Sequence, residues 1–399
     1  MKAKILIVDD ILQNIQIIGK ILSDTNYNVS YATDGVSALE KVNNINFDLI
    51  LLDIMMPEMD GFELCRLLKQ NEKSKEIPVI FLTAKSDDES IIQGFLSGGQ
   101  DYVSKPFQSQ ELLARIKTHL KLKSQSEKLK KTVKKLSVRN KKIKSSIQYA
   151  KTIQSALFPN IENIKKDFDD FFLIFKPRDI VSGDFYWYHK TEQYQIYIIA
   201  DCTGHGVPGA MLSMAGKTYL DQIVKYDKIT QPDKILNSLN THFKQLLKSS
   251  KYELIDGMDI SVFKFDFLNQ QIQYSAAGQD LFFFKDNHVM LFEADHLSIG
   301  GFKNEPEGSF KLYVIDFEKD TKYQFYMFTD GYTDQIGGEK GKRFTTKALK
   351  KLIAENHEKP MKIQELKYKD TLTYWFNGHK QLDDITFTGF SLKNYLDSI

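Results

Sequence analysis

Long apolar runs, paired cysteines and a secretion signal are absent from this sequence. No run of about 18 uncharged apolar residues occurs, which excludes a membrane-spanning helix. The first residues, MKAKILIVDD, end in two carboxylates and contain no small-residue cleavage site, so we expect no signal peptide. The two cysteines, Cys65 and Cys202, stand far apart without partners at metal-ligand spacing. This excludes a disulfide framework or a zinc site and favours the reducing cytoplasm.

The charged residues that are present are distributed unevenly along the 399 positions, although the formal net charge is only +2. Residues 1–112 have 10 basic and 17 acidic side chains, residues 113–158 have 14 basic and one acidic, and the remainder has 30 basic and 34 acidic. An acidic head, a basic middle and a mildly acidic tail predict a multidomain protein, which the length also favours.

Short apolar runs in the head alternate with stretches of helical periodicity such as 11–22 and 61–68. Such alternation predicts a doubly wound α/β domain with a parallel sheet and helices on both faces. In such folds, ligands bind beyond the carboxyl ends of the strands. The predicted strands are 5–8, 29–32, 49–52, 79–82 and 102–103.

Polar residues follow these runs directly. They are Asp9 and Asp10 after the first run, Asp53 after the third, Thr83 after the fourth and Lys105 after the fifth. Three carboxylates at one edge repel one another unless a hard cation such as Mg²⁺ neutralises them. A lysine and a hydroxyl beside them would bind phosphate oxygens, which predicts a carboxylate that accepts a phosphoryl group. The alternative is that each aspartate merely caps the next helix.

The head resembles the receiver domain of two-component response regulators over residues 1–120, through VDD at 8–10, LLDIMMPEMDG at 51–61, LTA at 82–84 and SKPF at 104–107. The resemblance implies that a sensor histidine kinase phosphorylates Asp53. It further implies that Asp10, Asp53 and the carbonyl of Met55 hold Mg²⁺, with support from Asp9. Thr83 and Lys105 would bind the phosphoryl group, and Tyr102 would change rotamer on activation.

The basic middle, taken as a linker over residues 121–158, predicts one long helix with a coiled-coil seam. Residues 113–157 contain no proline or glycine. Leu122, Leu129, Leu136 and Ile143 fall seven apart, as d positions do, and the series continues through Ala150 to Leu157. The matching a positions are mixed, and Asn140 among them favours a parallel, in-register homodimer. The a positions are Ser126, Val133, Asn140, Ile147 and Gln154.

The residues that flank this seam offer no attractive pairs. Each g position faces the next e position of the partner helix, which pairs Gln125 with Lys130, Thr132 with Ser137 and Arg139 with Lys144, and the last of these pairs is repulsive. We therefore expect a marginal zipper that acts as a two-state connector. The lysines also suggest nucleic-acid binding, but their charges surround the helix and no base-stacking aromatic precedes Tyr149, so a solvated helical surface is the favoured interpretation.

The tail, residues 159–399, has many apolar runs with β-strand alternation and few helical stretches. This pattern predicts packed antiparallel sheets with helices outside. The predicted strands are 171–175, 185–188, 195–200, 260–267, 271–275, 281–284, 312–317, 323–328 and 385–390. The predicted helices are 208–224, 233–248 and two more between 345 and 376.

Acidic residues again follow these runs, now beside glycines, as in Gly183-Asp184, Gly257-Met258-Asp259 and Asp330-Gly331. Each Asp-Gly taken alone is ordinary turn chemistry. Brought together, the carboxylates would form an oxygen-rich site for one or two Mg²⁺ or Mn²⁺ ions. Two such ions activate a water and clamp a phosphoryl oxygen for in-line displacement.

Residues 150–392 resemble the metal-dependent (PPM-type) protein Ser/Thr phosphatases, in the bacterial branch that dephosphorylates small anti-sigma-factor antagonists. The motifs are SGDFYW at 182–187, DCTGHGVPGAMLSM at 201–214, GMDISV at 257–262, FTDGYTD at 328–334 and DDITF at 383–387. The resemblance implies a β-sandwich flanked by helices. It also implies that Asp201 bridges two metals, the carbonyl of Cys202 binds one of them, Asp330 and Asp383 hold the other, and Asp184 completes the shell.

Some positions in this domain stay open. Asp384 adjoins Asp383 closely enough to be the ligand instead. His205 either donates a proton to the leaving oxygen or orders the glycine loop, with the second favoured, and Arg178 either contacts phosphate or stabilises the fold. Where the family commonly has Ala-Gly-His-Asn, this chain has Gln279 in place of the histidine.

The segment 147–159 resembles the helix that precedes the catalytic domain in this branch, where helix position controls assembly of the metal site. The simpler interpretation is docking onto the core through Ile153, Leu157 and Phe158. The sequence therefore predicts a phosphorylation-regulated response regulator whose output is a metal-dependent Ser/Thr phosphatase. The alternatives are a non-catalytic scaffold that binds a phosphorylated partner, and a DNA-binding regulator.

Overall fold

The computed structural model describes residues 2–84, 88–248, 257–300, 309–318 and 320–392. The chain divides into two compact units, residues 1–141 and 142–399, and each is described by itself. In the described part of the chain, no helix combines the length and the apolar character that crossing a bilayer requires.

The first unit is a five-stranded parallel sheet with the order β2-β1-β3-β4-β5. This confirms the predicted doubly wound head. The strands are β1 (Lys4–Val8), β2 (Asn28–Ala32), β3 (Leu49–Asp53), β4 (Val79–Thr83) and β5 (Asp101–Ser104). The helices are α1 (Leu12–Ser23), α2 (Gly35–Asn44), α3 (Gly61–Gln70), α4 (Asp88–Leu96) and the start of α5 (Ser109–Leu157).

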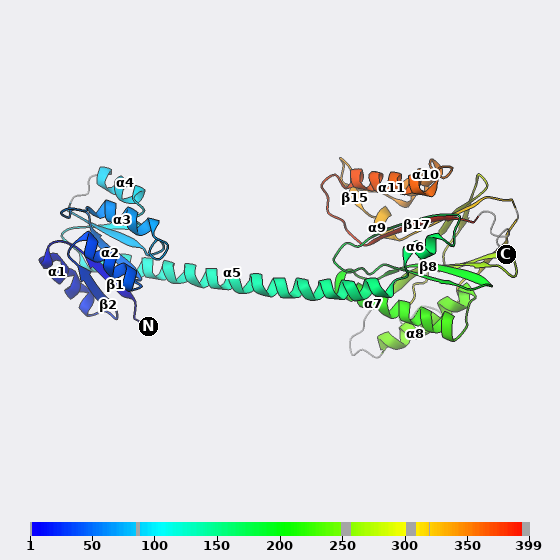
Figure 1. Cartoon of the computed structure of the whole chain (residues 1–399), viewed down its shortest axis with the longest axis horizontal. Helices are drawn as coiled ribbons and strands as arrows, with labels where there is room; N and C mark the ends of the chain where they lie inside the picture. Colours follow the sequence, from blue (N-terminus) through cyan, green and yellow to red (C-terminus); the bar gives the residue numbers. More distant parts are fainter. Residues whose placement is uncertain (1, 85–87, 249–256, 301–308, 319, 393–399) are drawn as a thin grey trace. The chain divides into compact units, whose positions relative to one another are not determined.

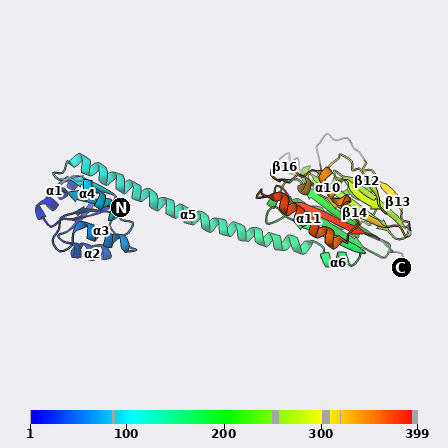
Figure 2. The same ribbon diagram turned by 90° about the horizontal axis from the view of Figure 1, so that it is seen from above.

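Both faces of this sheet are covered by helices, as Figure 2 shows for α2 and α3 on one side. On the opposite face Ile18 of α1 and Ile116 of α5 pack against Ile5 and Leu51. Burial on both faces explains why the strands are continuous apolar runs. Helix α2 is capped by Asp34 and α3 by Asp60, each through its side chain. The capping role weighed for Asp53 therefore belongs to Asp60 at this loop.

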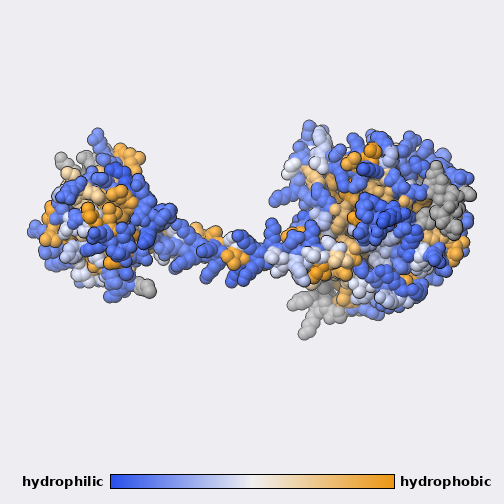
Figure 3. Space-filling view, viewed as in Figure 1, coloured by the Kyte–Doolittle hydropathy of each residue, from blue (hydrophilic) through white to orange (hydrophobic). Residues whose placement is uncertain are grey.

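Helix α5 is continuous over 49 residues, as the absence of proline and glycine predicted. Near the first unit, Lys123 Nζ donates to the carbonyl of Phe47 at 2.9 Å and lies 3.1 Å from Asp48 Oδ1. Farther along, the seam residues are exposed: Leu129 is 65% exposed and Ile143 is 58% exposed. Figure 3 shows a few apolar, orange atoms on the otherwise hydrophilic surface of this helix.

The second unit packs two antiparallel five-stranded sheets face to face, which confirms the predicted sandwich. The first sheet has the order β13-β10-β9-β8-β7 and the second β12-β11-β14-β17-β6. The strands are β6 (Asp170–Lys176), β7 (Phe185–Lys190), β8 (Tyr194–Cys202), β9 (Met258–Asp266), β10 (Gln271–Ala277), β11 (Leu281–Lys285), β12 (His288–Phe292), β13 (Tyr313–Asp316), β14 (Tyr323–Phe328), β17 (Ile385–Ser391) and a small pair, β15 (Ile336–Gly337) and β16 (Lys342–Arg343).

Helices cover the outer face of each sheet (Figure 1). An aromatic core fills the space between the sheets, with Phe263, Phe325 and Phe390 at its centre. Helices α7 and α8 cover the first sheet, and α10 and α11 cover the second. The helices of this unit are α6 (Ile161–Lys165), α7 (Gly206–Leu220) continued by a π-helical segment (Asp221–Tyr226), α8 (Pro232–Lys248), α9 (Asp330–Thr333), α10 (Thr346–Ala354) and α11 (Met361–Phe376).

The end of α5 docks onto this unit differently from the prediction. Ile153 is 46% exposed and Leu157 is 36% exposed, so neither side chain belongs to the buried core, and docking through these two stays a prediction. Phe158 does dock, with its ring centroid 5.4 Å from that of Tyr186. The seam prediction for Gln154 is wrong, because this side chain is only 4% exposed and is held by the second unit. Because the Gln154 side chain is hydrogen-bonded within its own unit, it cannot pack against a partner helix.

Candidate functional site

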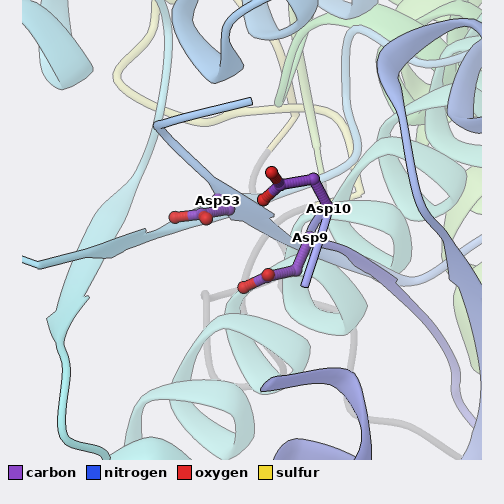
Figure 4. Close-up of side chains that lie close together, drawn as sticks. All are labelled: Asp9, Asp10 and Asp53. Atoms are coloured by element: carbon purple, nitrogen blue, oxygen red, sulfur yellow. The ribbon is translucent and has the colours of Figure 1, made fainter. Parts of the chain in front are cut away.

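Three carboxylates converge at the carboxyl edge of the receiver sheet, as Figure 4 shows. Asp9 and Asp10 follow β1, and Asp53 ends β3. Among the residues that the structure describes, this is the single set of three His, Cys, Asp or Glu side chains whose ligand atoms lie within 4.8 Å of one another. Parallel strands bring these residues together, because the carboxyl ends of β1 and β3 meet at one edge.

Lys105 joins this cluster from the loop after β5. Its ammonium lies 2.8 Å from Asp9 Oδ2 and 2.9 Å from Asp53 Oδ2. Burial raises the pKa of Asp53, and the hydrogen bond and charge of Lys105 oppose that rise. Asp9 is further held by Asn14, whose Nδ2 donates to Oδ1 at 2.9 Å. A buried Oδ1 of Asp10 has no protein partner, which fits a cation ligand.

The remaining predicted receiver residues lie around the same edge. Thr83 is buried at the end of β4, and Met55 follows Asp53 by two residues with its side chain 75% exposed. The loop that leads from Met55 to α3 ends at Gly61, where a Cβ would lie 2.1 Å from the carbonyl oxygen of Asp53. Tyr102 packs edge-on against Phe95. The switching role of Tyr102 stays a prediction.

In the second unit, four predicted ligands from distant parts of the sequence stand at the ends of strands. Phe185 pairs with Ala200 in the ladder of β7 and β8, so the residues beyond these two lie side by side. These neighbouring residues are Asp184, which precedes β7, and Asp201, which lies within β8. The other two predicted ligands are Asp330, at the start of α9, and Asp383, before β17. The sandwich therefore brings together residues that lie about 200 positions apart.

These carboxylates lie close enough to Asp201 for the side chains to affect one another's pKa values. Burial raises the pKa of Asp184 to about 7. Burial also raises the pKa of Asp201 well above its usual range, and the charges of Asp184, Asp330 and Asp383 add to this. Burial is the main cause of the raised pKa of Asp330 as well. Such mutual repulsion is the electrostatic environment that a divalent cation relieves.

The donor set around Asp184 fits a metal site. Its Oδ2 accepts hydrogen bonds from Thr329 Oγ1 at 2.8 Å and from Thr386 Oγ1 at 2.7 Å. Its Oδ1 is buried and has no protein hydrogen-bond donor. Because buried polar atoms normally have partners, this oxygen is suited to a cation or to an ordered water. Cys202, buried at the end of β8, would offer only its carbonyl, because its thiol pKa is raised well above normal by burial.

Asp383 and Asp384 have different surroundings. Both carboxylate oxygens of Asp384 accept from main-chain amides, those of Arg178 and Gly183, each at 2.6 Å. Asp383 lies close enough to Asp201 and Asp330 for its charge to raise both of their pKa values. Asp384 thus holds two loops together, and the assignment of Asp383 as the ligand stays a prediction.

A cleft of about 280 Å³ opens beside Asp201 and Asp330. Its lining includes Asp259, a residue that the sequence motif GMDISV contains but to which no role was assigned. Asp259 pairs with Asp201 across β9 and β8, and Ser298 Oγ donates to its Oδ1 at 2.7 Å. The position at the end of a predicted strand was a usable signal. Gln279, which replaces the family's histidine, also lines the cleft.

His205 and Arg178 lie at the loops that surround the site. His205 Nδ1 is 2.9 Å from Asp179 Oδ2, and both side chains are partly exposed. His205 directly precedes α7, which is consistent with the favoured role in ordering the glycine loop. Arg178 contributes its main-chain amide to Asp384. Contact of the Arg178 guanidinium with phosphate stays a prediction.

A receiver-type acidic site on a doubly wound sheet and an acidic cluster at the edge of a β-sandwich together define a response regulator with a PP2C-type phosphatase domain. Residues 5–117 match the family model of the response regulator receiver domain. Residues 191–393, just over half of the chain, match the model of Stage II sporulation protein E (SpoIIE). The chain belongs to the SpoIIE family and carries a receiver domain.

Similar proteins support each half separately. ResD of Bacillus subtilis, a transcriptional regulatory protein, is 40% identical over 125 residues, which are 31% of this chain and 51% of ResD. The response regulator PleD of Caulobacter vibrioides is 42% identical over 123 residues, 31% of this chain and 27% of PleD. The chain thus covers about half or less of these relatives. The SiaA-PP2C domain of Pseudomonas aeruginosa is 27% identical with a TM-score of 0.57, covering 64% of this chain and 99% of that domain.

Proposed function

We propose that this protein is a response regulator whose phosphorylation at Asp53 controls a metal-dependent protein serine/threonine phosphatase. The observation that carries the proposal is the grouping of Asp184, Asp201, Asp330 and Asp383, with burial and mutual repulsion raising the pKa values of the first three. Asp201 and Asp330 of this group line a cleft. The proposed substrate is a small phosphorylated protein such as an anti-sigma-factor antagonist, on the precedent of the family branch that the motifs resemble.

The chain's own residues divide the work at the phosphatase site. Asp201, between Asp184 and Asp330, would be shared by two ions, Mg²⁺ or Mn²⁺, with Asp383 and the carbonyl of Cys202 completing their ligands. Such ions supply Lewis-acid activation of water and of the phosphoryl group. Thr329 and Thr386 fix the orientation of the Asp184 carboxylate, and no protein nucleophile is required.

In the receiver, the proposed Mg²⁺ ligands are Asp9, Asp10, Asp53 and the carbonyl of Met55. Lys105, within 2.9 Å of Asp53, would bind the incoming phosphoryl oxygens as a point charge, and Thr83 would donate a hydrogen bond. The phosphodonor is a sensor histidine kinase. The two cysteines are free and buried, which is consistent with a cytoplasmic location.

The exposed seam of α5 supports a parallel homodimer. Leu122, Leu129, Val133, Leu136 and Ile143 are each more than half exposed in the single chain. Burying such a row against a second copy removes apolar surface from water. The lysines at e positions weaken this zipper, so we infer that it is a connector with two arrangements rather than a rigid clamp.

The catalytic assignment is tested by Mn²⁺-dependent hydrolysis of a phosphoserine protein. We expect Asp201→Asn to lower the rate at least about 100-fold, because losing a shared ligand should exceed the 10–100-fold cost typical of changing outer-shell partners. The exposed Asp227→Asn in the same unit is the matched control and should match the wild type. Equal rates for wild type and Asp201→Asn would sink the assignment, and tight phosphoprotein binding without turnover would indicate a scaffold.

A further inference from the structure

Gln154 is the buried polar exception in the last three turns of α5. Its side chain is 4% exposed, while residues on either side face outward, such as Ile153. Its side-chain amide makes three hydrogen bonds, with Ser182 and Ser213 of the same unit. Nε2 donates to the carbonyl of Ser182 at 2.7 Å and to Ser213 Oγ at 3.0 Å, and Oε1 accepts from the amide of Ser182 at 3.1 Å. Both main-chain polar groups of Ser182 therefore pair with one side chain.

Ser182 begins the short segment that enters the metal site. The next residue, Gly183, donates its amide to Asp384 Oδ2 at 2.6 Å. A Cβ at Gly183 would lie 2.7 Å from the carbonyl oxygen of Gly204 and 3.2 Å from that of Cys202, so this backbone packs directly against the glycine loop. The following residue is Asp184, whose pKa is raised by burial and whose Oδ1 has no protein partner.

The segment 182–184 is thus fixed at both ends. Gln154 holds Ser182 by its main chain, and Thr329 and Thr386 hold the carboxylate of Asp184. Only Gly183 lies between Ser182, which Gln154 contacts, and Asp184, so a shift of Ser182 displaces Asp184. Hydrogen bonds in a water-excluded environment fix such geometry strongly, because an unmade bond leaves a buried donor or acceptor unpaired.

We propose that Gln154 is a positioning residue for the phosphatase metal site, acting through Ser182 and Asp184 without touching the ions or the substrate. This inference rests on the proposed phosphatase function. It gives the end of α5 a specific chemical connection to the site: a rotation or withdrawal of the helix removes three hydrogen bonds from the backbone that orients Asp184. The connection is polar and directional, whereas the contact of Phe158 with Tyr186 is apolar and tolerant of small shifts.

The test compares three full-length variants with the wild type. Gln154→Ala removes the side chain, Gln154→Met keeps most of its volume without the amide, and Gln148→Ala removes an exposed glutamine from the same helix. Mn²⁺ binding is measured by titration calorimetry on metal-free protein, and kcat and KM are measured with a phosphoserine protein. We expect about tenfold weaker Mn²⁺ binding for both Gln154 variants, with kcat lowered and KM little changed. Gln148→Ala should match the wild type.

Gln154→Met separates positioning from packing. If it binds Mn²⁺ as tightly as the wild type, the hydrogen bonds do not position the site and the proposal is wrong. The same holds if both Gln154 variants lower the melting temperature while leaving Mn²⁺ affinity within twofold. A wild type that binds Mn²⁺ without hydrolysing phosphoserine would overturn the proposed function alone, because the calorimetric comparison of Gln154→Ala with Gln148→Ala would still decide the role of Gln154.

Discussion

Asp383 and Asp384 are adjacent in the sequence, yet the hydrogen bonds around them assign different work to each. Asp384 is 2% exposed, and both of its oxygens accept from backbone amides. An amide in its place would turn an NH₂ group toward one of those N–H donors. Asp383 is partly exposed and contributes its charge to the acidic cluster. Removing that charge relieves repulsion when no cation is bound.

We therefore expect opposite effects from two neighbouring substitutions. Asp384→Asn should lower the stability of the metal-free protein by about 1–3 kcal/mol, the cost of leaving a buried donor unpaired. Asp383→Asn should leave the metal-free stability unchanged or higher and should weaken Mn²⁺ binding by at least about tenfold. Thermal unfolding in a chelator and Mn²⁺ titration measure the two quantities. The reverse pattern, with Asp384→Asn losing metal and keeping its stability, would make Asp384 the ligand.

Among the individual residues, those that follow apolar runs could be predicted from the sequence, and those held by distant partners could not. Asp9, Asp53 and Asp201 stand where strands end, so strand periodicity alone places them at an edge. The role of Asp384 depends on Gly183, 201 residues away. That of Gln154 depends on Ser182. Side-chain hydrogen bonds between distant segments leave no periodic trace in a sequence.

At the scale of elements, strands and long helices were predicted because burial imposes a period on them. The elements that were missed are short or lie at edges. Strand β12 has four exposed residues, so it shows no alternation. Helix α9 is a single turn that begins at Asp330, where Asp-Gly was interpreted as a turn. Helix α5 was predicted as one element, but its period also assigned Gln154 to the seam, because heptad spacing cannot show which domain takes up a given face.

The seam itself gives a prediction for α5. We expect Leu136→Lys to make the full-length protein monomeric at concentrations where the wild type is a dimer, because a charge at a d position would be buried against the partner helix. Val138→Lys is the matched control: Val138 is 49% exposed on the same helix, but it lies outside the a and d positions. Sedimentation velocity distinguishes the species. Equal dissociation of both variants, or a wild type that is already monomeric, contradicts the seam.

At the scale of the whole molecule, α5 is the one element that belongs to both compact units. Its first turns pack in the receiver core through Leu112 and Ile116, and its last turns reach Ser182 through Gln154. Gln154 is also the last a position of the seam. Its side chain cannot face a partner helix and bind Ser182 at the same time, so a zipper that reaches Gln154 excludes the Ser182 contact. Because α5 is continuous, we expect a change in receiver pairing to reach Asp184 through this helix.

Interrupting α5 should consequently separate phosphorylation from catalysis. Lys141→Pro, at the boundary of the two units, removes a helical hydrogen bond and disrupts the helix, whereas Lys141→Ala preserves it. Each unit has its own core, so both should stay folded. We expect a small-molecule phosphodonor to change the phosphatase rate of the wild type and of Lys141→Ala severalfold, and to leave Lys141→Pro as unresponsive as Asp53→Asn. If Lys141→Pro responds fully, the signal passes by direct contact between domains, and the helix is only a tether.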